Sequence, residues 1–173
     1  MRGFIHMHPS PPRHPFPSFA YMPGVDAAHD HAALAPVLAL VPARFEACVP
    51  FDHPALRYGL ALNDAGFFWE SHEVLEAVWK VAPQGGRDRI LLRACIQIAN
   101  ANLKLRMNRP GAVTRLFREA LAELRELTMR EASEPTHAFA RNFNPLALID
   151  EINQRLIAAD PEDRPVKILA ASK

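Results

Sequence analysis

The sequence predicts an all-α protein, an up-and-down bundle of about five helices preceded by a Pro/His-rich N-terminal arm. Apolar residues recur at helical spacing in several stretches that short Pro-, Gly- and Asn-rich segments separate, and no stretch alternates as a half-buried strand does. The 173 residues, 49% of them hydrophobic, suit one domain with a sizeable core. We expect a partly docked arm over residues 1–50, the bundle over 51–160 and a loose tail over 161–173.

The arm is expected to be extended, because six prolines among its first 24 residues are too many for a helix or a central strand. It has no unbroken apolar stretch, so we expect no secretory signal. The bulky Phe16, Phe19 and Tyr21 should dock the arm on the bundle and bring His29 and His31 with them, so we expect the segment Phe19–His31 to be ordered. The three earlier histidines are expected to be solvated and mobile: His6, His8 and His14.

An apolar run at residues 32–43 follows the arm and is interrupted by two prolines. It is shorter than the roughly 20 residues of a membrane span, so no span is expected. The run either packs as a short helix or simply covers the bundle. The first bundle helix should start at Pro54, capped by Asp52 or His53, and end at the turn Asn63–Gly66.

The second helix should run from near Phe67 to Trp79, and its residues divide into two faces at about 100° per residue. Glu70 and Glu73 fall on the polar side, where we expect both to be solvated. Phe68 and Trp79 lie centrally in the apolar stripe and are predicted core anchors. The stripe comprises Phe67, Phe68, Val74, Leu75, Val78 and Trp79.

The segment His72-Glu73-x-x-Glu76 of this helix has two interpretations. It is a shortened form of His-Glu-x-x-His, so His72 and Glu76 are candidate ligands for zinc or manganese if His29 or His31 completes the set. Alternatively, the two side chains touch as an i,i+4 pair, and Glu76 holds the His72 ring in one tautomer at the core edge.

The third helix is predicted over about Asp88–Met107 and should be the most buried. Asn102 interrupts its apolar side and therefore needs a hydrogen-bond partner there. No carboxylate occurs between Ile90 and Met107, which excludes a di-iron site of the ferritin kind. One narrow polar stripe remains: Arg89, Arg93, Gln97, Asn100 and Lys104.

Two more helices complete the predicted bundle. The fourth should span about Ala112–Arg130, after a turn that contains Pro110. The fifth should begin at Pro145, with Asn144 as its cap, and end before Pro161.

The block GFFWESHEVLEAVW at residues 66–79 resembles the bacterial and archaeal family catalogued as domain of unknown function 309. The family also has an Ile-Gln-Ile-Ala run with a Lys seven residues after the Gln, a Gly-Ala pair, and a Tyr-x-Pro-Gly segment followed by a His. The corresponding residues here are Ile96–Ala99, Lys104, Gly111–Ala112, Tyr21–Gly24 and His29. The resemblance covers about residues 19–125 and implies a small helical bundle with no assigned activity. In the arm, Asp30 stands where the family usually has a Pro.

Charge and cysteine usage limit the possible partners and compartment. Lys and Arg number 20 against 19 Asp and Glu, a net charge of +1, so no basic field implies binding to nucleic acid or to an anionic membrane. Cys48 and Cys95 lack a short metal-binding spacing, and Cys95 lies in an apolar helix. We therefore expect reduced thiols and a cytoplasmic protein.

Two hypotheses of function follow. The first is a non-enzymatic helical module that binds a protein partner or a small polar ligand through a cluster of five residues. These are His72, Glu76, Arg93, Gln97 and Lys104. Antiparallel packing of the second and third helices would let Glu76 accept from Lys104 or Arg93, and would let Gln97 bridge to His72.

The second hypothesis is a metal-dependent hydrolase. His72 and Glu76 are its metal ligands, His29 or His31 completes the set, and Glu73 activates water as the candidate catalytic residue. A nucleophilic enzyme is disfavoured, because no Ser or Cys stands in an activating context.

Overall fold

Helices form almost all the regular structure of the described residues, 14–157 and 164–169, in the computed structural model, which confirms the all-α prediction. The elements are α1 His31–Leu38, α2 Pro54–Asp64, α3 Phe68–Val81, α4 Arg87–Arg106, α5 Pro110–Met129, the 3-10 helix η1 Ala140–Asn142, and α6 Pro145–Ile157. The only β feature in this part of the chain is an isolated bridge between Pro50 and Ala138.

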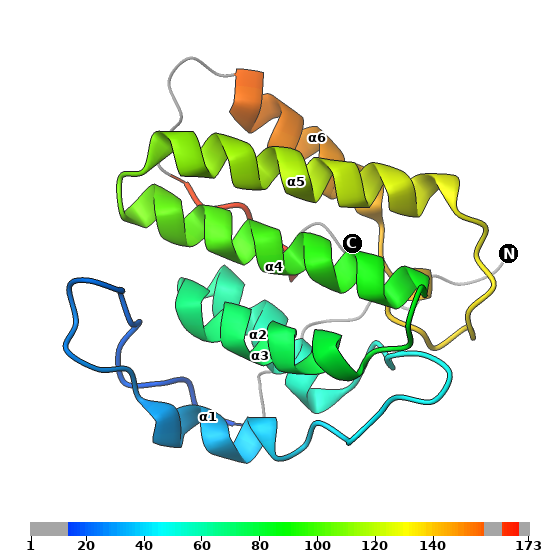
Figure 1. The fold of residues 1–173 in the computed structure, drawn as a ribbon, viewed down its shortest axis with the longest axis horizontal. Helices are drawn as coiled ribbons and strands as arrows, with labels where there is room; N and C mark the ends of the chain where they lie inside the picture. Colours follow the sequence, from blue (N-terminus) through cyan, green and yellow to red (C-terminus); the bar gives the residue numbers. More distant parts are fainter. Residues whose placement is uncertain (1–13, 158–163, 170–173) are drawn as a thin grey trace, which may run out of the picture.

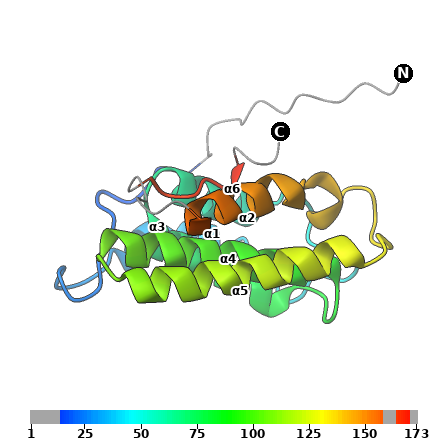
Figure 2. The same cartoon turned by 90° about the horizontal axis from the view of Figure 1, so that it is seen from above.

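Consecutive helices from α2 to α5 pack against one another, and α6 packs on α5 (Figure 1). Figure 1 shows α3, α4 and α5 side by side, with α1 beyond α3 at the opposite edge from α6. Figure 2 shows α4 and α5 in one layer along the lower edge of the view, with α2 and α6 above them. The central helix α4, as predicted, has more buried residues than any other helix.

The α2–α3 contact depends on two glycines. Gly59 lies so close to α3 that a Cβ atom there would stand 2.8 Å from Leu75 Cδ2, and the Ser71 hydroxyl donates to its carbonyl at 2.7 Å. Gly66 has φ of 91°, in the left-handed region that glycine adopts without strain, and it separates the two helices.

The helix boundaries lie within about two residues of the predicted ones. Pro54 occupies the first turn of α2 after His53, whose side chain makes no cap bond. Asn144 Oδ1 accepts from Leu146 N at 3.1 Å at the start of α6, as expected of a cap. Asn102 also has the partners that its burial requires.

The apolar run at residues 32–43 contributes to helix α1, despite the internal Pro36. Asp30 caps this helix, since its Oδ1 accepts from Ala33 N at 3.2 Å. That role accounts for an Asp rather than a Pro after His29.

The structure corrects three expectations. Trp79 is partly buried at the core edge, whereas Phe68 is only 1% exposed. Among the aromatic residues expected to dock the arm, Phe19 is 43% exposed, whereas the Phe16 ring contacts Tyr58 and Phe67. Helix spacing and side-chain size do not show how fully an individual aromatic side chain is covered.

The third correction concerns the tail. Val166 and Ile168 are fully buried and belong to the hydrophobic core, so residues 164–169 are not loose. Their main chain is held by side chains of α2 and α4 far away in sequence, which no local pattern reveals. The predictions for His6, His8 and the remaining tail residues lie outside the described residues.

Candidate functional site

Helix α3 brings His72, Glu73 and Glu76 together on one edge, called here the α3 edge. One ligating atom from each lies within 4.8 Å of the others, and all three residues are half-buried. The closest contact joins His72 Nδ1 to Glu73 Oε1 at 3.2 Å, while Glu76 Oε2 pairs with Lys80 Nζ at 3.4 Å. Glu76 thus forms its i,i+4 pair towards the helix C-terminus, and the predicted direct His72–Glu76 pair is replaced.

Two of the predicted polar residues of α4, Arg93 and Gln97, have their partners on α5. Arg93 Nε lies 2.8 Å from Glu123 Oε1, and Gln97 Nε2 donates to Glu119 Oε2 at 2.8 Å. Burial raises the pKa of Glu123, and the Arg93 charge acts against that rise. Lys104 Nζ lies near a methionine sulfur at 4.0 Å.

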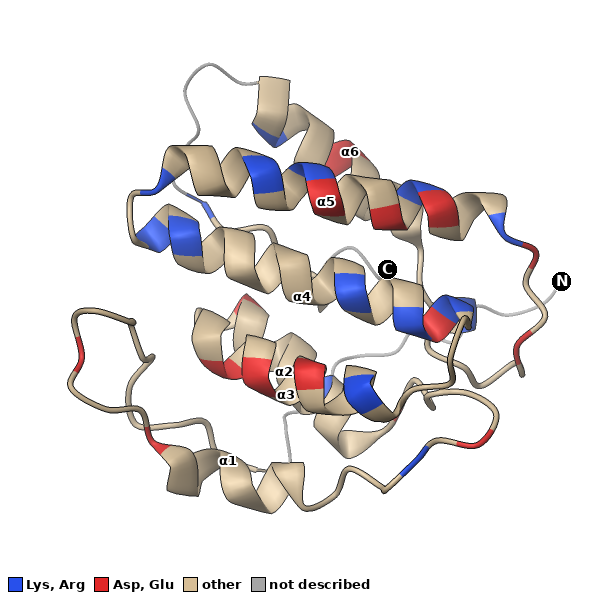
Figure 3. Cartoon of the chain, viewed as in Figure 1, with Lys and Arg blue, Asp and Glu red and all other residues tan. Residues whose placement is uncertain are grey.

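The predicted network between α3 and α4 therefore takes a different form. Glu76 pairs with Lys80 and not with Arg93 or Lys104. Gln97 does not bridge to His72, because Glu119 of α5 binds its amide, and Glu123 of α5 binds Arg93. Of the five predicted site residues, His72 and Glu76 lie on the α3 edge, Arg93 and Gln97 bind α5, and Lys104 lies at the end of α4. Figure 3 shows acidic residues along α3 and mixed charges along α5, with α4 between them.

The arm histidines lie elsewhere. His29 Nε2 is 2.9 Å from His31 Nδ1, and the His29 ring packs on Trp69 at 4.2 Å between centroids. Within the described ranges, the one group of His, Cys, Asp and Glu side chains close enough to share a metal ion is the α3 edge, which contains neither arm histidine. Glu73 takes the place that the metal hypothesis assigned to His29 or His31.

Glu70 is a buried charged residue whose role the sequence pattern does not predict. Expected to be solvated, it is 2% exposed, its Oε1 accepts from Tyr21 N at 2.7 Å, and its Oε2 has no hydrogen-bond partner. Burial raises its pKa, and the Tyr21 hydrogen bond opposes that rise. The available signal was Trp69 beside it, since a Trp on a polar helix face indicates that another segment covers that face.

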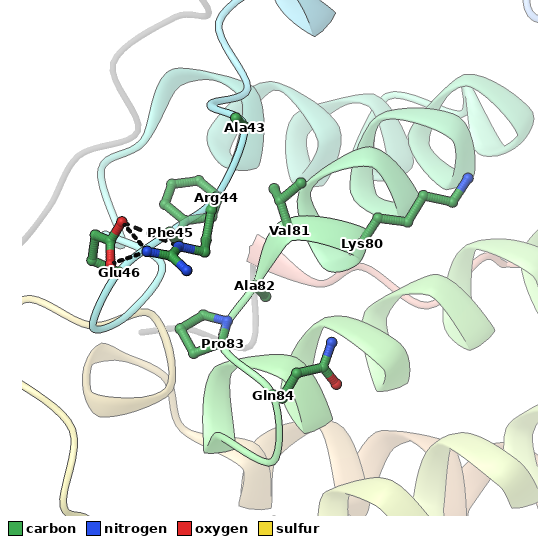
Figure 4. Close-up of a pocket in the computed structure, with 9 residues that line it drawn as sticks. All are labelled: Ala43, Arg44, Phe45, Glu46, Lys80, Val81, Ala82, Pro83 and Gln84. Atoms are coloured by element: carbon green, nitrogen blue, oxygen red, sulfur yellow. Dashed lines mark hydrogen bonds and ion pairs between the residues drawn. The ribbon is translucent and has the colours of Figure 1, made fainter.

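A hollow of about 410 Å³ lies between residues 43–46 and the end of α3 (Figure 4). Arg44 and Glu46, which both line the hollow, pair with each other at 2.9 Å, and Phe45 N donates to Val81 O at 3.0 Å. Lys80 lines the hollow, but in Figure 4 its amine points away from the Arg44–Glu46 pair. The hollow therefore adjoins the α3 edge without containing it.

Residues 56–116 match the family described as Domain of unknown function (DUF309). This confirms the resemblance predicted from the sequence, although the DUF309 match includes neither the arm nor residues beyond the first part of α5. No curated protein and no solved structure matches the chain.

The DUF309 segment contains the α3 edge and all of α4, so the predicted polar residues lie inside it. Glu119 and Glu123, which bind the α4 residues, lie outside it. The family description assigns no activity. Among the described residues, no helix has the length and apolar character needed to cross a membrane.

Proposed function

We propose that this DUF309 protein is a non-enzymatic binding module whose α3 edge receives a cationic side chain of a protein partner. The supporting observation is the convergence of two carboxylates and an imidazole within 4.8 Å. Lys80 pairs with Glu76, but it is 62% exposed, and Glu73 pairs only with His72, which is charged only when protonated. A cation is therefore the complementary group for this edge.

The neighbouring helices do not supply that cation. Arg93 is engaged by Glu123, and Glu119 pairs with both Gln97 and Arg115. These α4–α5 pairs leave the negative charge of the α3 edge available to an external group. An exposed ion pair contributes only about 0–1 kcal/mol, so stable binding requires several contacts and should weaken as salt increases.

A divalent cation is the second candidate, because the same three donors suit zinc or manganese. Metal bonds of about 2.0–2.2 Å hold ligand atoms at most about 4.4 Å apart, so a separation of up to 4.8 Å requires small side-chain rotations. With Glu73 as a ligand, the α3 edge has no further carboxylate to activate water. The geometry thus supports metal binding better than the predicted hydrolase.

The test is an NMR titration of the full chain with a tetralysine peptide, following the His72 ring signals. We expect saturable, salt-sensitive shifts that the double variant Glu73→Gln/Glu76→Gln loses. The control variant Glu131→Gln/Asp150→Asn removes the same charge from two exposed positions, one after α5 and one on α6. Equal loss in the control, or no shift in the wild type, would overturn the proposal. Stoichiometric broadening of the His72 signals by Mn²⁺, without a peptide response, would favour the metal candidate.

We also infer a cytoplasmic location. Cys48 and Cys95 are both free and buried, and burial raises the pKa of each thiol. Reduced, unreactive thiols support a reducing compartment.

A further inference from the structure

We propose that Asn63, Asp64 and Asn102 form a peptide-binding slot, called here the tail slot, which recognises the main chain of an extended segment with the pattern apolar-x-apolar. Residues 164–169 of the same chain are its resident ligand. The segment, red in Figures 1 and 2, lies on the side of α4 that carries α2 and α6. The tail slot is separate from the α3 edge and does not depend on the function proposed for that edge.

Asn102 imitates the edge of a β-strand. Its Oδ1 accepts from Val166 N at 2.9 Å, and its Nδ2 donates to Val166 O at 2.9 Å. Two residues that face each other in antiparallel strands pair in the same way, because the N–H and the C=O of one residue both bond to the other residue. Here the side-chain amide supplies both groups, so recognition at this position depends on the peptide backbone and not on its side chain.

Asp64 and Asn63 extend this recognition along the segment. The Asp64 carboxylate accepts from Ile168 N at 2.7 Å through Oδ1 and from Leu169 N at 3.0 Å through Oδ2. Asn63 Nδ2 donates to Val166 O at 3.0 Å and to Asp64 Oδ1 at 3.0 Å, which orients the carboxylate. Each of these contacts to the tail ends on a main-chain atom.

The side chains of the segment set the pattern requirement. Val166 and Ile168 are fully buried, whereas Lys167 between them is exposed. The slot thus has two apolar pockets two residues apart, as expected for a bound extended chain. A basic or polar residue is accepted between them.

The slot requires an occupant. Asn63 and Asn102 are 1% and 0% exposed, and their amides bond to each other, to Asp64 and to the tail. Removal of the segment would leave buried amide groups without partners. The slot residues lie in the DUF309 segment 56–116, whereas the ligand comes from outside it. The same bonds are available to any extended main chain with the required apolar spacing.

The test uses the full chain with residues 158–163 replaced by a protease recognition sequence, folded first and cleaved afterwards. A fluorescent peptide with the sequence of residues 164–173 is then added in excess, and its anisotropy is followed to equilibrium. We expect saturable binding as the peptide displaces the cleaved segment, and competition by unlabelled peptide. A peptide with Lys167→Ala should bind equally well.

The decisive comparison is a peptide N-methylated at Val166 and Ile168, which keeps both side chains but lacks two main-chain donors. We expect it to bind at least tenfold more weakly. Equal binding would overturn backbone recognition. Loss of helical circular dichroism on cleavage, or the absence of any exchange, would show instead that the segment is a permanent part of the core.

Discussion

Two buried carboxylates, Glu70 and Asp88, and the half-buried Asp64 perform one recurring task in this protein. Glu70 binds a main-chain N–H of the arm, Asp64 binds two of the tail, and Asp88 binds two from segments before α2 and at η1. Burial raises the pKa of all three. Each of these helix residues therefore anchors a non-helical segment distant in sequence, and helix periodicity alone cannot reveal that role.

The variant Glu70→Gln tests the cost of this burial. Because the pKa of Glu70 is raised in the folded state, the folded protein binds its proton more readily, and the contribution of this group to stability falls as pH rises through the folded pKa. Glutamine keeps an acceptor for Tyr21 N and carries no charge. We expect Glu70→Gln to gain stability relative to wild type on going from about pH 4 to pH 7, by on the order of 1 kcal/mol.

Urea unfolding at several pH values measures this difference. The matched control is Glu131→Gln, at an exposed position after α5. A stability difference for Glu70→Gln that does not change with pH would show that the carboxyl group stays neutral, or that the arm does not bury it.

Local signals account for the elements that were predicted well. Prolines at the starts of α2, α5 and α6 and the glycine between α2 and α3 define boundaries without reference to distant residues. The arm and tail are different, since their positions depend on partners far away in sequence. For the same reason the local sequence at Asn63 and Asp64 predicts a turn, whereas the two residues end α2 and hold the tail.

The attachment of the arm depends on Trp69, which contacts the Tyr21 and His29 rings at 5.0 and 4.2 Å between centroids. Each aromatic pair contributes about 0.5–1.5 kcal/mol beyond its area burial. We expect Trp69→Ala to release the arm and to accelerate chymotryptic cleavage at Tyr21 at least severalfold, with little change in helical circular dichroism. His72→Ala, on the same helix, is the control. Unchanged cleavage would mean that Glu70 and Phe16 hold the arm without the stacked rings.

At the scale of the molecule, the candidate site could be predicted only as far as one helix defines it. The spacing of His72, Glu73 and Glu76 brings them together whatever surrounds α3. The pairing of Arg93 and Gln97 depends on which neighbouring helix offers carboxylates, and α5 does so. Sequence patterns predict which residues share a helix face. Which neighbouring helix supplies the carboxylate for a given donor depends on how the helices pack.

The bundle is closed at one end by contacts around Asp88. Its Oδ2 accepts from Val49 N and its Oδ1 from Ala140 N, both at 2.7 Å. These two segments also contact each other, since Phe139 N donates to Val49 O at 2.8 Å. Asp88 therefore fixes the segment before α2 and the segment before α6 to the first turn of the central helix.

Asp88→Asn should consequently destabilise the whole molecule. Asparagine has one acceptor oxygen in place of two, so its NH2 group would face a main-chain N–H. Residue 88 is only 3% exposed, and leaving that buried donor without an acceptor costs roughly 1–3 kcal/mol of stability. We expect a lower urea midpoint and faster hydrogen exchange at both Val49 and Ala140, because each amide loses or weakens its bond to the same side chain. Asp52→Asn, at an exposed position, should change neither. Faster exchange at these two amides with an unchanged midpoint would show that the closure is a local clamp which opens independently of the bundle.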